Sequence, residues 1–312
     1  MAHIDISFVI PALNEEKCIV DTIASIYNFV SSEYHFEIIV VDNGSTDRTK
    51  HLAASAGATV YVEPDAKVGA LRNLGVAHST GQYLVFLDAD VRLTKSWNQG
   101  INETFHMLEK NPNIVTGSKC GVSETPSFIE KYWFAPLLSK NSSYINSGHL
   151  ITTRQLFDKL GGFSAELTSG EDYDFSIRAK KLGAKIINNQ DLAVIHTGYP
   201  STLKAFMLRE MWHGIGDIQT FKKFISSKVA ILSSLLMLSQ IILLFSIVGG
   251  YSIVTFCSLF VLFAIPFISS CVKYKSENLK FILINSIIFY LYLMSRFFSF
   301  FVKAKKITSR SS

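Results

Sequence analysis

The stretch VFLDADV, Val85–Val91, is an apolar run that ends on two carboxylates one residue apart. A buried strand ordinarily ends on a turn residue, whereas this one ends on Asp88 and Asp90. Two carboxylates at the end of a strand can hold a divalent cation and leave coordination positions open for phosphate oxygens, as Mg²⁺ and Mn²⁺ prefer. Taken alone, the same pair can also be an acidic turn that caps the following helix.

Apolar runs of strand length alternate with helical patterns over the first 120 residues. The runs lie at 5–10, 36–42, 58–63, 82–88 and 113–118, and helical patterns follow at 15–30, up to about 56, near 67–79 and near 95–109. This alternation predicts an α/β fold with a mostly parallel sheet and helices on both faces. Three of the runs end in polar clusters, PALNEE, DNGSTD and DADV, which we expect to meet in one crevice beyond the strand ends.

The charge of the chain is unevenly distributed. The 312 residues are 48% hydrophobic with a mean hydropathy of +0.27, and residues 222–312 carry eleven Lys and Arg against one acid, Glu277. A mildly acidic body with a basic, apolar tail excludes a nucleic-acid binder, whose basic patch would belong to the folded domain. It suits attachment to an anionic cytoplasmic leaflet, so we expect membrane lipids as partners at the inner or plasma membrane. No cleaved signal peptide is expected at the N-terminus.

Two apolar runs in the tail, 229–248 and 252–272, are long enough to cross a bilayer as helices and are separated only by Gly249, Gly250 and Tyr251. Lysines flank both open ends, which predicts a membrane hairpin with both ends, and the catalytic domain, on the cytoplasmic side. A third run, 281–302, contains Asn285 and Arg296. A spanning helix would place the basic tail outside, so the preferred interpretation is an interfacial helix, with spanning as the alternative.

Four further groups of residues bear on the site. Asp42 ends a second strand, where its carboxylate can accept the imide N–H of a uracil. Arg72 lies in the helix before the D-x-D strand, although a solvated helix face would also explain it. Glu171 and Asp172 begin a helix after Gly170, where acidic residues are common. His196 follows the apolar run LAVI, and a single histidine is more often structural. A Rossmann dehydrogenase is excluded, because PALNEE replaces the required G-x-G-x-x-G.

In this order and spacing the chain resembles the inverting family 2 glycosyltransferases of the GT-A fold, over about residues 10–200. The matching elements are SFVIPALNEE, IIVVDNGSTDRT, GALRNLGVAHSTGQYLVFLDAD, GGFSAEL and GEDYDFSIRAKKLG. The resemblance implies transfer of a sugar from a nucleotide-sugar donor, usually UDP-linked, with Mg²⁺ or Mn²⁺. It also implies a division into a GT-A domain (1–225) and a membrane region (226–312). The domain comprises a nucleotide-sugar half (1–120), an acceptor half (121–200) and a membrane-proximal helix (201–225).

The resemblance also implies roles for single residues. Asp42 reads the uracil, Arg72 supports the base or phosphates, Asp172 is the general base, and Glu171 stands beside it near the acceptor. The implied nucleotide-sugar pocket is lined by Pro11, Ala12, Leu13, Glu15, Asp42, Arg72, Asp88 and Ala89, and the implied metal ligands are Asp88, Asp90 and His196. Leu13 departs from the family, which often has an aromatic residue there.

The reaction itself leaves alternatives. A processive polymer synthase is disfavoured, because FMLREMWHGIG (206–216) lacks the Q-x-x-R-W motif of those enzymes. A polyprenyl-phosphate acceptor needs no base, so the Glu171–Asp172 pair favours a sugar hydroxyl, and membrane attachment suggests a lipid-linked glycan of envelope polysaccharide. A nucleotidyltransferase would have a basic, glycine-rich first loop in place of PALNEE. A non-catalytic membrane adaptor would neither hydrolyse nor transfer a UDP-sugar. The donor sugar, the linkage and the oligomeric state stay open.

Overall fold

The computed structural model describes residues 4–138, 143–218, 220–275 and 277–301. By its internal contacts the chain forms two compact units: a catalytic unit of residues 1–123 and 138–199, and a membrane unit of residues 124–137 and 200–312. Compact packing does not show where an activity begins or ends, so the functional division at 225/226 stays a prediction.

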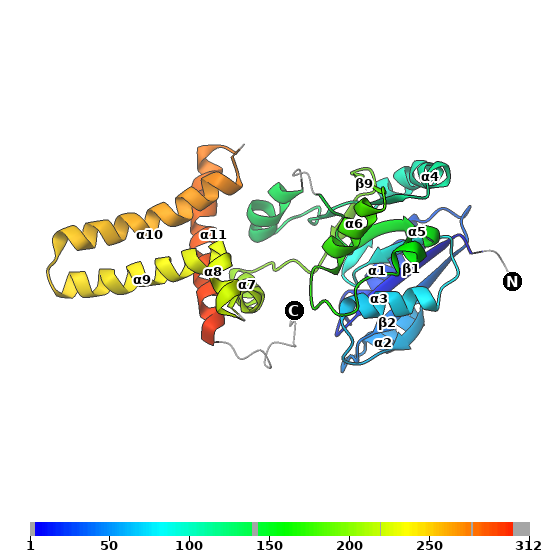
Figure 1. Ribbon diagram of the computed structural model, residues 1–312, viewed down its shortest axis with the longest axis horizontal. Helices are drawn as coiled ribbons and strands as arrows, with labels where there is room; N and C mark the ends of the chain where they lie inside the picture. Colours follow the sequence, from blue (N-terminus) through cyan, green and yellow to red (C-terminus); the bar gives the residue numbers. More distant parts are fainter. Residues whose placement is uncertain (1–3, 139–142, 219, 276, 302–312) are drawn as a thin grey trace. The chain divides into compact units, whose positions relative to one another are not determined.

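The catalytic unit is built on a seven-stranded sheet (Figure 1). In spatial order its strands are β3 (Thr59–Val62), β2 (Phe36–Asp42), β1 (Ile6–Ala12), β4 (Tyr83–Leu87), β8 (His149–Thr153), β6 (Ile114–Gly117) and β9 (Lys185–Asn188). All neighbours pair in parallel except β8, which is antiparallel to both β4 and β6. The predicted mixed, mostly parallel sheet is therefore confirmed.

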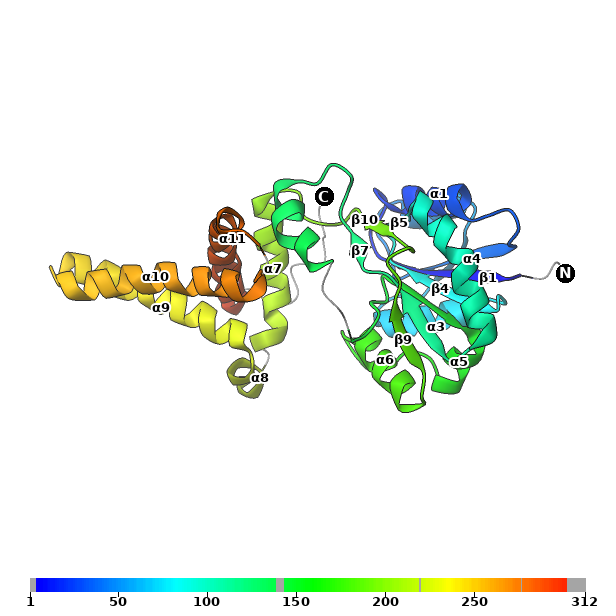
Figure 2. The same ribbon diagram turned by 90° about the horizontal axis from the view of Figure 1, so that it is seen from above.

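Helices cover both faces of this sheet, as Figure 2 shows. They are α1 (Ile19–Phe29), α2 (Thr49–Ser55), α3 (Val68–Ala77), α4 (Lys95–Lys110), α5 (Arg154–Leu160) and α6 (Glu171–Lys181). Alternate residues of β1 pack on opposite faces of the sheet, because successive side chains of a strand point to opposite sides. Phe8 packs in the core that contains Trp97 of α4, whereas Val9 packs in the core that contains Phe175 of α6.

A second, three-stranded sheet extends the carboxyl end of β4. It contains β5 (Val91–Leu93), β10 (Val194–His196) and β7 (Cys120–Gly121), with β10 in the middle. His196 pairs with Val91, so the end of β10 lies directly beside the D-x-D turn. This small sheet brings a residue from position 196 to a site that the sequence places at positions 88–90.

In the membrane unit, the helix expected at 201–225 is two helices, α7 (Leu203–Ile218) and α8 (Phe221–Ser226). Thr220 has an extended backbone and its hydroxyl accepts a hydrogen bond from the Lys223 amide, which starts a new helix there. The expectation of one continuous helix is therefore wrong.

Within the part of the chain that the structure describes, three helical segments are long and apolar enough to cross a bilayer: α9 (Lys228–Val248), α10 (Ser252–Lys273) and Leu279–Phe301. The last comprises α11 (Leu279–Phe298) and the 3₁₀ turn η3 (Ser299–Phe301). α9 and α10 form a hairpin that turns at Gly250, whose φ of 70° suits glycine. Figures 1 and 2 show α11 running crosswise to both helices at the open end of this hairpin.

Candidate active site

The D-x-D carboxylates leave β4 in different surroundings. Asp88 is half-exposed, and its Oδ1 accepts a 2.8 Å hydrogen bond from Arg72. Asp90 is buried, and its Oδ2 lies 3.4 Å from Nε2 of His196. Thr197 also binds Asp90, because its amide and hydroxyl both donate to the Asp90 carbonyl, at 2.8 and 2.9 Å. The structure thus brings three of the predicted residues, Asp88, Asp90 and His196, to one end of the sheet.

Gly198 leaves the space that the Asp90 carboxylate occupies. A Cβ added at Gly198 would overlap Asp90 Oδ2, so a side chain at this position would displace the carboxylate. Nδ1 of His196 is buried and has no hydrogen-bond partner among the described residues. Among these residues, no group of three or more histidine, cysteine or acidic side chains is arranged so that it could hold a metal ion. Cations of the Mg²⁺ type commonly use one or two protein carboxylates and take their other ligands from phosphates and water.

Arg72 lies at the centre of the site, and its side chain is only 2% exposed. One terminal nitrogen donates to Glu171 Oε1 and the other to Asp88 Oδ1, both at 2.8 Å. A buried guanidinium needs such charged partners to offset its desolvation. The two carboxylates come from distant parts of the chain, so one arginine joins the D-x-D turn to the start of α6. A solvated helix face is excluded for this residue.

Glu171 and Asp172 begin α6 after Gly170, which has a φ of 81°. The Ser147 hydroxyl donates to Glu171 Oε1 at 3.0 Å, and the Ser147 amide donates to Asp172 Oδ2 at 3.4 Å. The neighbouring Tyr173 amide donates to Asp172 Oδ1 at 2.7 Å. Burial raises the pKa of the Asp172 carboxyl above its usual range, and the nearby charge of Glu171 raises it further. Asp172 is therefore a stronger base than an exposed aspartate.

The residues predicted to bind the nucleotide lie at the ends of β1 and β2. Ala12 pairs with Asp42 across these strands, next to Pro11. Asp42 is fully buried, and its Oδ1 accepts the amides of Gly44 and Ser45 at 3.0 and 2.8 Å. Its Oδ2 is buried and has no hydrogen-bond partner among the described residues. An oxygen of this kind has full capacity to accept a hydrogen bond from a ligand.

The other predicted pocket residues differ in exposure. Leu13 is exposed after β1, and the Glu15 amide donates to the Thr49 hydroxyl. Ala89 is buried between the two aspartates, with its carbonyl bound by the Thr22 hydroxyl at 2.7 Å. Ala89 therefore fixes the D-x-D turn against α1.

Sequence reasoning missed the loop that supports both carboxylate groups, residues 146–149. A Cβ at Gly148 would lie 2.8 Å from Asp88 Oδ2, and Ser147 contacts the start of α6. His149 is fully buried, and burial lowers its pKa to about 3, so the ring is neutral. The Trp97 indole donates to its Nε2 at 2.9 Å. The stretch INSGH (145–149) leads into β8, whereas polar residues that indicate a ligand site at a sheet edge come after a strand.

Comparison with known proteins identifies the family. The model of "Glycosyl transferase family 2" matches residues 7–164, just over half of the chain. A pre-mycofactocin glycosyltransferase of Mycobacterium tuberculosis is 24% identical over 229 residues, which cover 68% of this chain and 47% of that protein. The chain thus spans about half the length of this relative. The amylovoran biosynthesis glycosyltransferase AmsB of Erwinia amylovora is 26% identical over 211 residues, covering 60% of this chain and 67% of AmsB.

A solved structure supports the same fold. The mannosyltransferase PcManGT from Pyrobaculum calidifontis, in complex with GDP-Man and Mn²⁺, aligns with 95% of this chain and 86% of its own, at a TM-score of 0.54 and 16% identity. At this identity the likeness shows the fold alone, which is the predicted GT-A type with apolar helices after it. On the family match over residues 7–164, the chain belongs to glycosyl transferase family 2.

Proposed function

We propose that this glycosyltransferase moves a sugar, with inversion, from a UDP-sugar to a hydroxyl of a lipid-linked glycan on the cytoplasmic face of a membrane. The observation that carries the proposal is the bridge through Arg72, which binds Glu171 and Asp88 at 2.8 Å each. The bridge places the carboxylates expected on the donor side and on the acceptor side in one site. A non-catalytic adaptor has no need for such a buried arrangement.

The donor part of the proposal rests on Asp42. Its buried Oδ2 lacks a partner among the described residues, while its Oδ1 holds the following turn. A uracil ring presents an imide N–H that a carboxylate oxygen can accept. The solved neighbour PcManGT binds GDP-Man, so a guanine donor is the competing outcome of a donor screen.

The residues at the D-x-D fit a divalent cation such as Mg²⁺ or Mn²⁺. Asp90 offers a carboxylate oxygen and His196 an imidazole nitrogen, 3.4 Å apart and beside the space left by Gly198, and Asp88 leaves one oxygen outside its bond to Arg72. Oxygen and imidazole ligands suit these metals. When bound, the cation would neutralise the diphosphate leaving group. The solved neighbour PcManGT contains Mn²⁺.

The chemical step needs one base. Asp172 takes the proton of the acceptor hydroxyl while the hydroxyl oxygen forms a bond to the anomeric carbon. The bond from that carbon to the diphosphate oxygen breaks on the opposite face, so the configuration inverts. Because its pKa is raised, Asp172 is a proton acceptor whose pKa lies closer to neutral pH than that of an exposed aspartate, as suits a general base. Glu171 is held by Arg72 and Ser147, and its role is to orient the start of α6.

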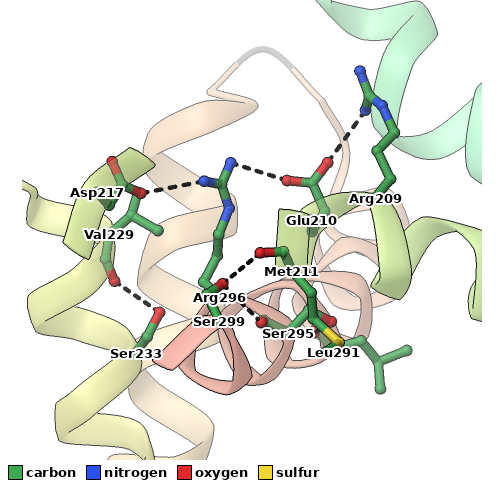
Figure 3. Close-up of polar contacts among 10 residues, drawn as sticks. All are labelled: Arg209, Glu210, Met211, Asp217, Val229, Ser233, Leu291, Ser295, Arg296 and Ser299. Atoms are coloured by element: carbon green, nitrogen blue, oxygen red, sulfur yellow. Dashed lines mark hydrogen bonds and ion pairs between the residues drawn. The ribbon is translucent and has the colours of Figure 1, made fainter. Parts of the chain in front are cut away.

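The membrane unit suggests where the acceptor is found. Arg296 of α11 binds Glu210 and Asp217 of α7, at 3.0 and 3.2 Å, and Arg209 also binds Glu210 (Figure 3). These ion pairs fix α11 at the depth of α7, a helix with too many charges to enter a bilayer. We therefore place α9 and α10 across the membrane, and α7 and α11 in the cytoplasmic interface. AmsB, named for amylovoran biosynthesis, supports an envelope polysaccharide as the product.

The first experiment tests donor and metal together. Purified full-length protein is titrated with UDP and with GDP, each with and without Mn²⁺, by calorimetry. We expect UDP binding to require the metal and to be lost in Asp90→Ala, because one carboxylate fewer leaves too few fixed oxygens for the cation. The control is Asp191→Ala, an exposed acid outside the D-x-D motif. If Asp90→Ala still binds UDP without the metal, the D-x-D has only a structural role. If the protein binds GDP in preference to UDP, the donor is a GDP-sugar.

A second experiment tests the topology. In intact cells, a membrane-impermeant maleimide should label Gly250→Cys at the tip of the hairpin. Glu277→Cys, an exposed position at the open end, should react only after the cells are broken. If Glu277→Cys is labelled in intact cells, the open end of the hairpin faces the outside, and a cytoplasmic nucleotide-sugar donor is excluded.

A further inference from the structure

The chain that follows β10 folds back against the D-x-D turn and against β7. Thr197, directly after the strand, donates to the Asp90 carbonyl through both its amide and its hydroxyl. Further along, the Tyr199 hydroxyl donates to the carbonyl of Cys120 in β7 at 3.0 Å. β7 and β10 are neighbours in the small sheet. This return segment, residues 196–199, is therefore bound both to the D-x-D turn and to the small sheet.

The Tyr199 ring packs on the imidazole of His196. The two ring centroids are 4.3 Å apart and the ring planes are inclined by 30°. The imidazole cannot turn about its Cβ–Cγ bond without breaking this contact, which is favourable in its own right. Because the Tyr199 hydroxyl is bound to β7, the tyrosine ring does not follow the imidazole freely. In this orientation Nε2 of His196 lies 3.4 Å from Oδ2 of Asp90.

The second ring nitrogen of His196 lacks the contact that usually orients a metal-binding histidine. Such a histidine ordinarily donates from its other nitrogen to a carboxylate or a carbonyl, which fixes the rotation of the ring. Nδ1 of His196 is buried, and no residue in the described part of the chain forms a hydrogen bond with it. Packing can fix the ring in place of that hydrogen bond, and Tyr199 is the aromatic ring packed against it.

We propose that Tyr199 is a positioning residue for the cation site. Its ring holds the imidazole of His196 with Nε2 beside Asp90, and its hydroxyl holds the tyrosine to β7. The proposal rests on the proposed function, in which Asp90 and His196 bind a divalent cation, and it adds a residue that acts through the histidine. Residues that orient a metal ligand commonly contribute about 10- to 100-fold to metal affinity. The alternative is that Tyr199 only packs the end of the catalytic unit.

The test measures how much Mn²⁺ the protein needs in order to bind its nucleotide. Full-length protein is titrated by calorimetry with UDP, or with GDP if the parent prefers it, at a series of Mn²⁺ concentrations. Tyr199→Leu removes the ring, and we expect the Mn²⁺ concentration for half-maximal binding to rise about tenfold. Excess Mn²⁺ should restore the parent affinity for the nucleotide, which a misfolded variant would not regain. Tyr199→Phe keeps the ring and loses only the bond to Cys120, so its Mn²⁺ requirement should lie between those of the parent and Tyr199→Leu.

A double variant separates positioning from packing. His196→Ala should itself raise the Mn²⁺ requirement. Adding Tyr199→Leu should then change it no further, because a residue that acts through His196 has nothing left to position. The matched control is Tyr61→Leu, because Tyr61 stacks on His78 with the ring centroids 3.9 Å apart, and neither residue belongs to the candidate site. This control should need as much Mn²⁺ as the parent.

Two outcomes would overturn the proposal alone. If Tyr199→Leu needs no more Mn²⁺ than the parent, the tyrosine is a packing residue. If it has the same effect in the parent and in His196→Ala, it does not act through the histidine. Should Tyr199→Leu fail to fold, Tyr199→Phe takes its place in both backgrounds, and a parent-like Mn²⁺ requirement counts against the proposal. A parent that binds no nucleotide, or binds it without Mn²⁺, would instead refute the proposed function, and the role of Tyr199 would fall with it.

Discussion

Replacing Asp172 with asparagine should slow transfer by about 10²–10⁴-fold and at the same time stabilise the protein at neutral pH. The two effects have one cause, the buried negative charge. Asparagine keeps the shape of the side chain, and its amide oxygen can still accept the Tyr173 amide, which now binds Oδ1 at 2.7 Å. The bond from the Ser147 amide is 3.4 Å long, at the limit for a hydrogen bond, so its loss costs little.

The sign of the stability effect follows from the pKa. Burial raises the pKa of Asp172 in the folded state, and the charge of Glu171 adds to the rise. A raised pKa means that the carboxyl contributes stability below its unfolded pKa of about 3.9. That contribution is lost as the pH rises through the folded pKa. Asp172→Asn has no such loss, so its melting temperature should exceed that of the parent at pH 7.5, with a smaller difference at pH 4.

The magnitude of the catalytic effect follows from the role of a base. Removing a positioned general base typically costs about 10²–10⁴ in rate, and asparagine cannot take the proton from the acceptor hydroxyl. UDP affinity should change little if Asp172 acts on the acceptor, as we propose. The assay measures sugar transfer, UDP binding and thermal unfolding on one preparation. In the parent, the rate should fall on the acid side as Asp172 is protonated, at a higher pH than an ordinary aspartate would give.

Two results would refute this reasoning. An Asp172→Asn enzyme that transfers sugar within a few-fold of the parent rate would remove Asp172 from the chemistry, and would favour a polyprenyl-phosphate acceptor that needs no base. If Asp172→Asn melts at a lower temperature than the parent at pH 7.5, the charge of Asp172 stabilises the fold, which contradicts a raised pKa. Asp174→Asn, in the same first turn but paired with Arg178, is the matched control for helix capping.

Two further predictions concern the donor side. Arg72→Met should destabilise the protein by about 3–5 kcal/mol, because it leaves the buried Glu171 carboxylate without its cationic partner, whereas the half-exposed Asp88 adds little. The melting temperature should fall by roughly 10 °C, and it should hardly change in Arg48→Met, which removes an exposed ion pair. Asp42→Asn should weaken UDP binding by about 10- to 150-fold, since a hydrogen bond to a charged group contributes about 1.5–3 kcal/mol; calorimetry that finds unchanged affinity would exclude Oδ2 as the base acceptor.

Much of the donor half could be predicted from the sequence because it is built from local patterns. The run Val85–Leu87 fills the core, and the chain then leaves the sheet at Asp88, so hydrophobic periodicity locates the site directly. The same holds for Asp42 at the end of β2. Asp42 pairs with Ala12 at the end of β1, and Asp88 directly follows β4, so both lie at the carboxyl ends of strands that run parallel to β1.

The remainder could not be predicted because it depends on long-range pairing. β8 enters the sheet between β4 and β6 in the antiparallel sense, and nothing in the sequence of His149–Thr153 marks that order. Arg72 and Glu171 lie 99 residues apart, so their bond is invisible to any local pattern. The break between α7 and α8 depends on a single threonine cap. The docking of residues 124–137 onto the membrane unit depends on aromatic contacts from α10 and α11.

The extent of the family match bears on where the acceptor is chosen. The match ends at residue 164, before Glu171 and Asp172, and so covers the strands that place Asp42, Asp88 and Asp90. Many sugar donors carry the same nucleotide diphosphate. A rigid sheet edge suits the binding of a group that does not vary between donors. Glu171 and Asp172, which we propose act on the acceptor, stand at a helix start instead, where Ser147 donates to both. Loops on a rigid scaffold are where binding specificity varies. We therefore expect the residues that select the acceptor to lie between 121 and 200, with the segment Glu124–Leu137 as the first candidate. Changes there should alter acceptor use while UDP binding persists.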